Sequence, residues 1–248
     1  VGKGIQADVF KAQVELSAIE EMILTMKQMA EAARANINSL LDFSPDNPLG
    51  IPAEIPFYDL KKDLSELSEA AMKNSPVLRE AELMVEQGMS EVDLAKKEFY
   101  PNFMVEAGKD FKGPFKDMYE VMVGIEIPLY RGRKQAKLLE ESRSKLSSSR
   151  NSLASMKNEI GFMLSENFLM AKTSENLVKL YKERIIPQAT LSLESSLSNY
   201  QVDRVDFLML LSDINSLFSY EMDYVKNLTN LWISVSRIEE MTFLEFIQ

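Results

Sequence analysis

One stretch of the sequence alternates apolar and polar residues, whereas the rest of the chain repeats its apolar residues at helical spacing. The stretch runs from Tyr100 to Gly132. In its second half the odd positions are all apolar, and they are Tyr119, Val121, Val123, Ile125 and Ile127. Successive residues of a strand point to opposite faces, so this pattern predicts a strand with one apolar face. The opposite face carries Glu120 and Glu126.

The first half of the same stretch repeats the alternation more weakly. Phe103, Val105 and Ala107 alternate with residues that include Glu106, and the segment 112–114, Lys-Gly-Pro, supplies turn residues between the two halves. The stretch therefore predicts a β-hairpin. A lone two-stranded hairpin is marginally stable in water, so we expect this one to join strands from elsewhere.

Heptad spacing of apolar residues predicts long helices on both sides of the hairpin. The predicted helices are 5–41, 60–74, 75–99, 133–197 and 205–240. Pro187 is expected to bend the longest one. Between residues 42 and 58 four prolines and a glycine exclude helix and predict a connector packed by its own apolar residues. The short link between the last two helices makes them antiparallel.

Composition excludes several classes of function. The chain has neither Cys nor His, which rules out thiolate and imidazole metal sites, Cys/His nucleophile pairs and disulfides. A net charge of -10 argues against nucleic-acid binding. No apolar run is long enough for a transmembrane helix. Met156, Met163 and Met170 fall at seam spacing, so we interpret them as core residues and not as a soft-metal relay. We expect neither an enzyme, a cofactor nor a metal.

Six segments, taken in order, resemble the TolC-like outer membrane efflux protein family. They read GIQADVFKAQVELS, NSPVLREAE, FYPNF, GIEIPLYRG, IIPQA and YQVDRVDFLMLLSDI. The resemblance spans essentially the whole chain and is to the second part of such proteins. It implies a mainly α fold of long antiparallel coiled-coil hairpins of the α-barrel tunnel type, with a β-hairpin that belongs to a trimeric outer-membrane β-barrel. Because the chain begins at Val1 without Met, we expect an N-terminally truncated member.

The resemblance also implies a division of the chain into parts. Residues 1–41 would be a periplasmic tunnel helix, 42–74 an equatorial connector with a short helix, and 75–99 a tunnel helix of a second repeat. Residues 100–132 would be the barrel hairpin, and 133–248 a long helical hairpin with a periplasmic tip at 200–206. The segment Val1-Gly2-Lys3 resembles Val202-Asp203-Arg204, which predicts two copies of one helical unit.

Candidate site residues follow from the resemblance and fall into three groups. The tip, for adaptor docking and gating, would use Gly2, Lys3, Gly4, Asp8, Tyr200, Asp203, Arg204, Asp206 and Asp213. The water-filled barrel lumen would be faced by Glu106, Glu120 and Glu126. Lipid would be faced by Tyr119, Val121, Val123, Ile125 and Ile127, as the alternation of transmembrane barrels requires.

Two positions depart from the family pattern at the tip. Asp203 stands where the family usually has glycine, which permits a positive φ in the tight turn. Asp tolerates this conformation better than most residues, so we expect the turn to survive. The acidic residue usually found at the position of Ser212 is shifted by one, to Asp213.

The expected function is the exit duct of a tripartite efflux or type I secretion system in the Gram-negative outer membrane, with most of the chain in the periplasm. The expected partners are a homotrimer, a periplasmic adaptor (membrane fusion) protein, an inner-membrane RND or ABC pump and outer-membrane lipid. Transport would be passive, with substrate and energy set by the pump. The alternative is a soluble coiled-coil scaffold whose hairpin pairs within an oligomer.

Overall fold

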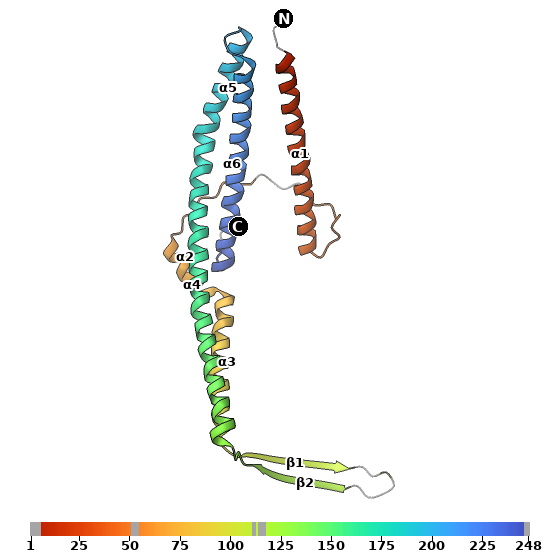
Figure 1. The fold of residues 1–248 in the computed structure, drawn as a ribbon, viewed down its shortest axis with the longest axis vertical. Coiled ribbons are helices and arrows are strands. Elements are labelled where there is room, and N and C mark those ends of the chain that lie inside the picture. Colours follow the sequence, from red (N-terminus) through yellow and green to blue (C-terminus); the bar gives the residue numbers. More distant parts are fainter. Residues whose placement is uncertain (1–5, 51–54, 111–112, 114–117, 246–248) are drawn as a thin grey trace. The chain divides into compact units, whose positions relative to one another are not determined.

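The computed structural model describes residues 6–50, 55–110, 113 and 118–245 of the chain. These residues form long helices and one β-hairpin (Figure 1). They divide into two compact units: the first contains Val1–Leu60 and Met170–Ser234, and the second contains Lys61–Leu169 and Val235–Gln248. The mainly α fold with a single hairpin confirms the fold class predicted from heptads and alternation.

The helices expected from heptad spacing are present, with small shifts at their ends. In chain order the elements are α1 (Gln6–Leu40), α2 (Leu64–Asn74), α3 (Pro76–Lys97), β1 (Asn102–Asp110), β2 (Met118–Glu126), the π-helical turn η1 (Arg131–Gln135), α4 (Ala136–Leu180), the π-helical turn η2 (Tyr181–Ile185), α5 (Ile186–Gln201) and α6 (Phe207–Thr242). Among the described residues, none of these helices combines the length and the hydropathy that crossing a bilayer requires.

Close packing of α3 against α4 organises the second unit. Helix α3 begins where the sequence predicts: the Ser75 Oγ accepts a hydrogen bond from the Leu78 amide at 3.5 Å, and Pro76 occupies the first turn. The seam of α3 is buried and includes Gly88. A Cβ on Gly88 would lie 3.3 Å from the Leu146 Cδ1, so glycine allows the close helix approach that small seam residues predict.

Pro187 disturbs the long helix through a π-helical turn. The amide of Ile186 donates to the Tyr181 carbonyl, which is five residues back instead of four. Proline lacks an amide hydrogen, and its ring collides with the carbonyl four residues earlier, so one widened turn just before it accommodates both defects. The hydrogen bonding of the helix therefore changes at the place where a bend is predicted.

The helix ends support the prediction that the chain repeats one helical unit. Asp42 follows α1 with φ 57°, and Phe243 follows α6 with φ 53°. The similar segments before α1 and α6 match Gly2 with Asp203. The same offset in sequence matches Asp42 with Phe243. The likeness in sequence therefore extends to the way in which both helices end.

Side chains of the helices hold the connector in the first unit. The Trp232 indole Nε1 donates to the Pro56 carbonyl at 2.7 Å, and its ring centroid lies 5.8 Å from that of Tyr58. Leu60 is fully buried, and its carbonyl accepts a hydrogen bond from the Lys172 ammonium. Phe57 is exposed. For the described residues of the connector, the expectation that it packs by its own apolar residues is therefore wrong.

A buried carboxylate lies between the lysines that reach the connector. The Glu175 side chain is 5% exposed, and its oxygens lie 2.7 Å from the Lys179 Nζ and 3.1 Å from the Lys172 Nζ. Burial by itself acts to raise the pKa of Glu175, but hydrogen bonds from Lys179 and Lys172 outweigh it and lower the pKa. The Lys179 Nζ also lies 4.0 Å from an Asp59 carboxylate oxygen, so this cluster ties α4 to the connector.

Glu175→Gln should lower the free energy of unfolding at pH 7 by about 1–3 kcal/mol, because two charged hydrogen bonds are weakened at a buried site. The lowered pKa makes this stabilisation fully present above the ordinary Glu value of 4.5, and it is lost as the pH falls through the folded-state value. Urea unfolding across this pH range measures the effect. Glu166→Gln, an exposed change on the same helix, is the control. Equal behaviour of both variants would contradict the assigned role.

Candidate functional site

The register of the hairpin separates its side chains into two chemically different faces. Strands β1 and β2 pair antiparallel, and cross-strand partners share a face. The apolar pairs on one face are Phe103 with Ile125, Val105 with Val123, and Ala107 with Val121; Tyr119 opposite Lys109 continues this face. The other face carries all three predicted lumen residues, in the pairs Glu126 with Asn102, Glu106 with Met122, and Glu120 with Gly108. The predicted alternation is confirmed.

The apolar face of the hairpin is uncovered. Val105 is 72% exposed and Val123 is 70% exposed, although both are β-branched residues that stabilise strands chiefly when packed. The described residues form one sheet of two strands, so the outer edge of each strand has no partner strand within this part of the chain. Such a hairpin needs further strands at its edges and an apolar medium or a partner at this face.

Aromatic residues mark the two ends of the apolar face. Tyr119 lies at the loop end of β2 and Tyr130 lies beyond its other end, and both are more than two-thirds exposed. Strand β2 ends at Glu126, so Ile127, which was expected within the strand, lies one residue past it. The predicted turn residues 112 and 114 lie outside the described residues, but Gly113 between them has φ 58°, which a turn there requires.

The link between α5 and α6 is a tight helix-ending motif with aspartate in the left-handed position. Asp203 has φ 58°. The Arg204 amide donates to the Asn199 carbonyl at 2.9 Å, and the Asp203 amide donates to the Tyr200 carbonyl at 3.1 Å. These two bonds form a Schellman motif, which is usually closed by glycine. The expectation that the turn survives with Asp203 in place of glycine is confirmed.

Other predicted tip residues either support this turn or are exposed beside it. The Asp206 Oδ1 accepts a hydrogen bond from the Met209 amide at 2.9 Å and so caps α6. The Tyr200 ring packs against Phe207, with centroids 6.4 Å apart. The side chain of Arg204 is exposed. Asp206 thus has a structural role at the turn, whereas the guanidinium of Arg204 is accessible to a partner.

Asp213 bonds to the neighbouring helix, and sequence reasoning missed its partner. Its Oδ2 accepts a hydrogen bond from the hydroxyl of Ser196, which is buried on α5. Ser196 lies five residues before the end of α5 and Asp213 lies six residues after the start of α6, so antiparallel pairing of the two helices could have predicted this contact. Asp213 is half-buried. Its carboxylate is therefore partly engaged within the helical pair.

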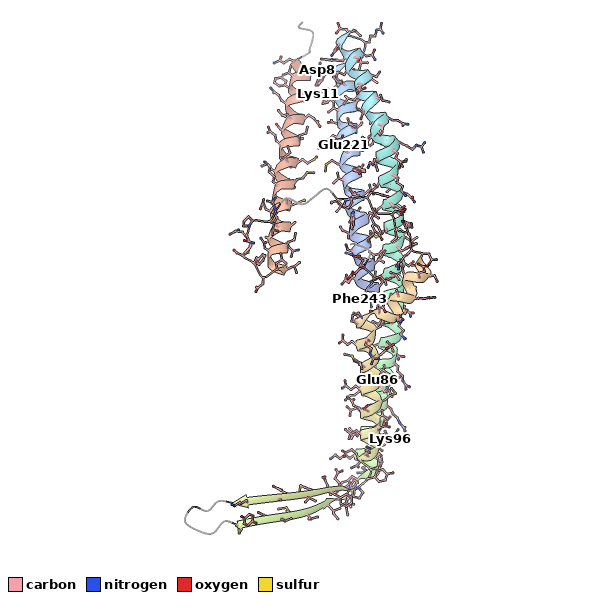
Figure 2. The ribbon with its side chains drawn as sticks, turned by 180° about the vertical axis from the view of Figure 1, so that it is seen from behind. Asp8, Lys11, Glu86, Lys96, Glu221 and Phe243 are labelled. Atoms are coloured by element: carbon pink, nitrogen blue, oxygen red, sulfur yellow. The ribbon has the colours of Figure 1, made fainter. Side chains whose placement is uncertain are left out.

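The N-terminal tip residues are only partly covered by the structure. Gly2, Lys3 and Gly4 lie outside the described residues. Asp8 is half-buried in the first turns of α1, where Figure 2 labels it. The structure thus places one of these four predicted residues and leaves the role of all four a prediction.

Helix α1 exposes its heptad seam, in contrast to α3. Its seam residues Val9, Leu16, Ile23 and Ile37 are each about half exposed. Among the described residues of α1, Asn38 alone is buried. An apolar stripe of this length at heptad spacing is typical of a helix that packs against others.

Two of the three methionines in the series do not lie in a core, whereas Met156 is half-buried. Met163 is 36% exposed and Met170 is 49% exposed, so the interpretation of both as core residues is wrong for this chain by itself. The heptad rule identifies a seam but does not say which chain covers it. Within the described part of the sequence, no cluster of three or more His, Cys, Asp or Glu side chains is placed to hold a metal ion.

Comparison with known proteins identifies the fold. No family model and no curated protein matches the sequence. Three similar solved structures are the outer membrane protein VceC from Vibrio cholerae (TM-score 0.79, 14% identity, 98% of this chain and 59% of that one), the outer-membrane channel OprN (0.75, 18%, 96% and 56%) and the open state of the Neisseria gonorrhoeae MtrE outer membrane channel (0.69, 16%, 97% and 56%). This chain thus spans less than three-fifths of the length of each. The TolC-like fold indicated by the six motifs is confirmed.

Asp203→Val should destabilise the tip by about 1–2 kcal/mol, because a β-branched residue is strained at positive φ. Asp203→Asn is the matched control, since Asn tolerates this conformation. Amide hydrogen exchange at Arg204, whose amide is bonded across the turn, reports the change locally. Faster exchange is expected in the Val variant alone. Equal exchange in both variants would contradict the strained turn.

Proposed function

We propose that this chain forms part of a passive exit duct in the Gram-negative outer membrane, within a tripartite efflux or type I secretion system. The observation that carries the proposal is the hairpin, whose register gives one exposed face that is apolar except for Lys109 at its loop end, and one face with three glutamates. This is the alternation of a strand pair with lipid on one side and water on the other. The likeness to solved outer-membrane channels supports the same interpretation.

The hairpin would be completed by other strands in a closed barrel. A bilayer offers no water to satisfy open strand edges, so a hairpin can cross it only when its edges are paired. In a homotrimer the hairpins of three protomers, together with strands outside this chain, would close that ring. Tyr119, Val121, Val123, Ile125 and Ile127 would then face lipid. Glu106, Glu120 and Glu126 would line the water-filled lumen.

The helices would form the wall of a periplasmic tunnel. The exposed heptad seam of α1 supports this assignment, because in a tunnel each helix packs against neighbours that come partly from other protomers. Residues 42–74 would surround the equator, 75–99 and 133–248 would continue the wall, and 1–41 would supply a helix of the first repeat. Most of the chain would therefore lie in the periplasm.

The periplasmic end would carry the tip residues and dock a periplasmic adaptor, which connects to an RND or ABC pump. The exposed Arg204 and Tyr200 are available to make hydrogen bonds or ion pairs between protomers that hold the tip closed. Asp203, Asp206 and Asp213 add negative charge nearby. Gly2, Lys3, Gly4 and Asp8 would form the companion tip. Energy and substrate choice would come from the pump, so the duct itself needs no catalytic group.

In the full-length trimer, Arg204→Ala should raise conductance in planar bilayers, because a closed tip loses a donor and a positive charge. The matched control is Arg184→Ala, an exposed arginine at the π-helical turn and away from the tip. We expect the wild-type protein to conduct weakly, the Arg204 variant to conduct several-fold more, and the control to match the wild type. Absence of any conductance from all three proteins would contradict the duct. Equal conductance of all three would contradict gating by Arg204.

A further inference from the structure

We propose that the foot of the hairpin binds the phosphate head groups of anionic phospholipid through a cationic cluster formed by Lys97, Arg133 and Lys134. This inference rests on the proposed membrane position of the hairpin and adds a lipid-selective contact to it. The cluster lies where α3 ends and α4 begins, next to both strands. Figure 2 labels Lys96, the neighbour of Lys97, at this end of α3.

The charge of this segment is unusual for the chain that contains it. The protein has a net charge of -10, yet residues 127–139 contain four cationic residues and no acidic one. The π-helical turn η1 begins at Arg131, directly after Tyr130. The backbone amides of Arg133 and Lys134 both donate to the Tyr130 carbonyl at 3.0 Å. Two cations thus sit one turn away from an exposed tyrosine.

The position of these cations is unfavourable for the helix itself. The start of a helix carries the positive end of its dipole, so acidic residues are stabilising there and cations are not. Arg133 and Lys134 occupy the first turn before α4, and the first acidic residue of that helix is Glu140. Helix stability therefore does not explain why the segment is cationic. Binding of an anionic partner outside the chain explains the cationic residues of this segment.

Ion pairing within the chain leaves part of the cluster available. Lys96 pairs with Asp93 at 2.7 Å, and Lys137 pairs with Glu140 at 2.7 Å. Among the described residues, Lys97, Arg133 and Lys134 have no carboxylate within ion-pair distance, and all three are exposed. The nearby acids Asp93 and Glu140 are thus already engaged. Lys97 at the end of α3, and Arg133 and Lys134 before α4, thus present exposed positive charge that forms no ion pair with the described residues.

The two helix ends are held together at the foot. A cavity there is lined by Phe99 from the end of α3 and, from the start of α4, by Ala136, Leu139, Arg143 and the ion-paired Glu140. Lys97 lies two residues before Phe99 in sequence, and Lys134 lies two residues before Ala136. The cations of both helices therefore lie next to the point where the two helix ends meet.

The apolar surroundings indicate lipid instead of a soluble anion. Tyr100 is 70% exposed, Tyr130 is 72% exposed and Leu129 is 82% exposed, and in sequence they lie between the strands and the cations. Tyrosines concentrate at the level of lipid head groups, where one end of the ring is apolar and the other is wet. Cations at that level attract anionic lipid. This order of apolar strand, tyrosine and cation matches the order of acyl chain, interface and phosphate.

The test uses the purified protein in nanodiscs that contain phosphatidylcholine and phosphatidylglycerol, followed by mild detergent extraction and quantification of the lipid that stays bound. We expect phosphatidylglycerol to be enriched. Arg133→Gln combined with Lys134→Gln should lower its ratio to phosphatidylcholine by roughly fivefold for each cation removed. Arg133→Lys combined with Lys134→Arg should keep the enrichment. Lys145→Gln combined with Lys157→Gln, an equal charge change on α4, should leave it unchanged.

Each other outcome contradicts the inference in a different way. Nanodisc insertion without phosphatidylglycerol enrichment would overturn the lipid contact and leave the membrane duct standing. Failure to insert into any nanodisc would overturn both. An equal fall in the two glutamine variants would assign the preference to overall charge. Displacement of the lipid by millimolar inorganic phosphate, but not by chloride at equal ionic strength, would assign the site to small anions.

Discussion

Backbone hydrogen bonding at the outer edges of the hairpin is the constraint on which the rest of the structure depends. Strands β1 and β2 pair their backbone amides and carbonyls with each other along one edge only, and their apolar face is exposed. An open edge beside an apolar surface is a site of aggregation in water and is not tolerated in lipid. The hairpin must therefore be completed by further strands. A closed ring of strands satisfies both requirements at once.

The helices likewise differ in whether their apolar seams are buried within this chain or exposed. The seam of α3 is buried against α4, and Gly88 allows that approach because it has no Cβ. The seam of α1 has the same heptad spacing and is exposed. The connector is fixed by Trp232 and by the lysines around Glu175. Seams that are packed within the chain thus coexist with seams that the chain itself leaves exposed.

The sequence predicted the features that depend on local periodicity. Alternation located the hairpin and both of its faces, heptads located the helices, and Asp203 was correctly expected to adopt a positive φ. Predictions that depended on which segments meet in space were poorer. The connector is held by α4 and α6 instead of by itself, and Ser196 was missed as the partner of Asp213. Met163 was wrongly placed in a core, because a heptad specifies a stripe and not the chain that covers it.

The central claim is that one face of the hairpin contacts lipid and the other contacts water. Because the chain has no cysteine, single spin labels can be attached at Val121, Met122, Val123 and Gly124 without background labelling. The measurement is the relaxation of each label by oxygen, which partitions into lipid, and by a water-soluble nickel complex. The account predicts that oxygen dominates at Val121 and Val123 and nickel at Met122 and Gly124. Equal access of nickel to all four positions would contradict it.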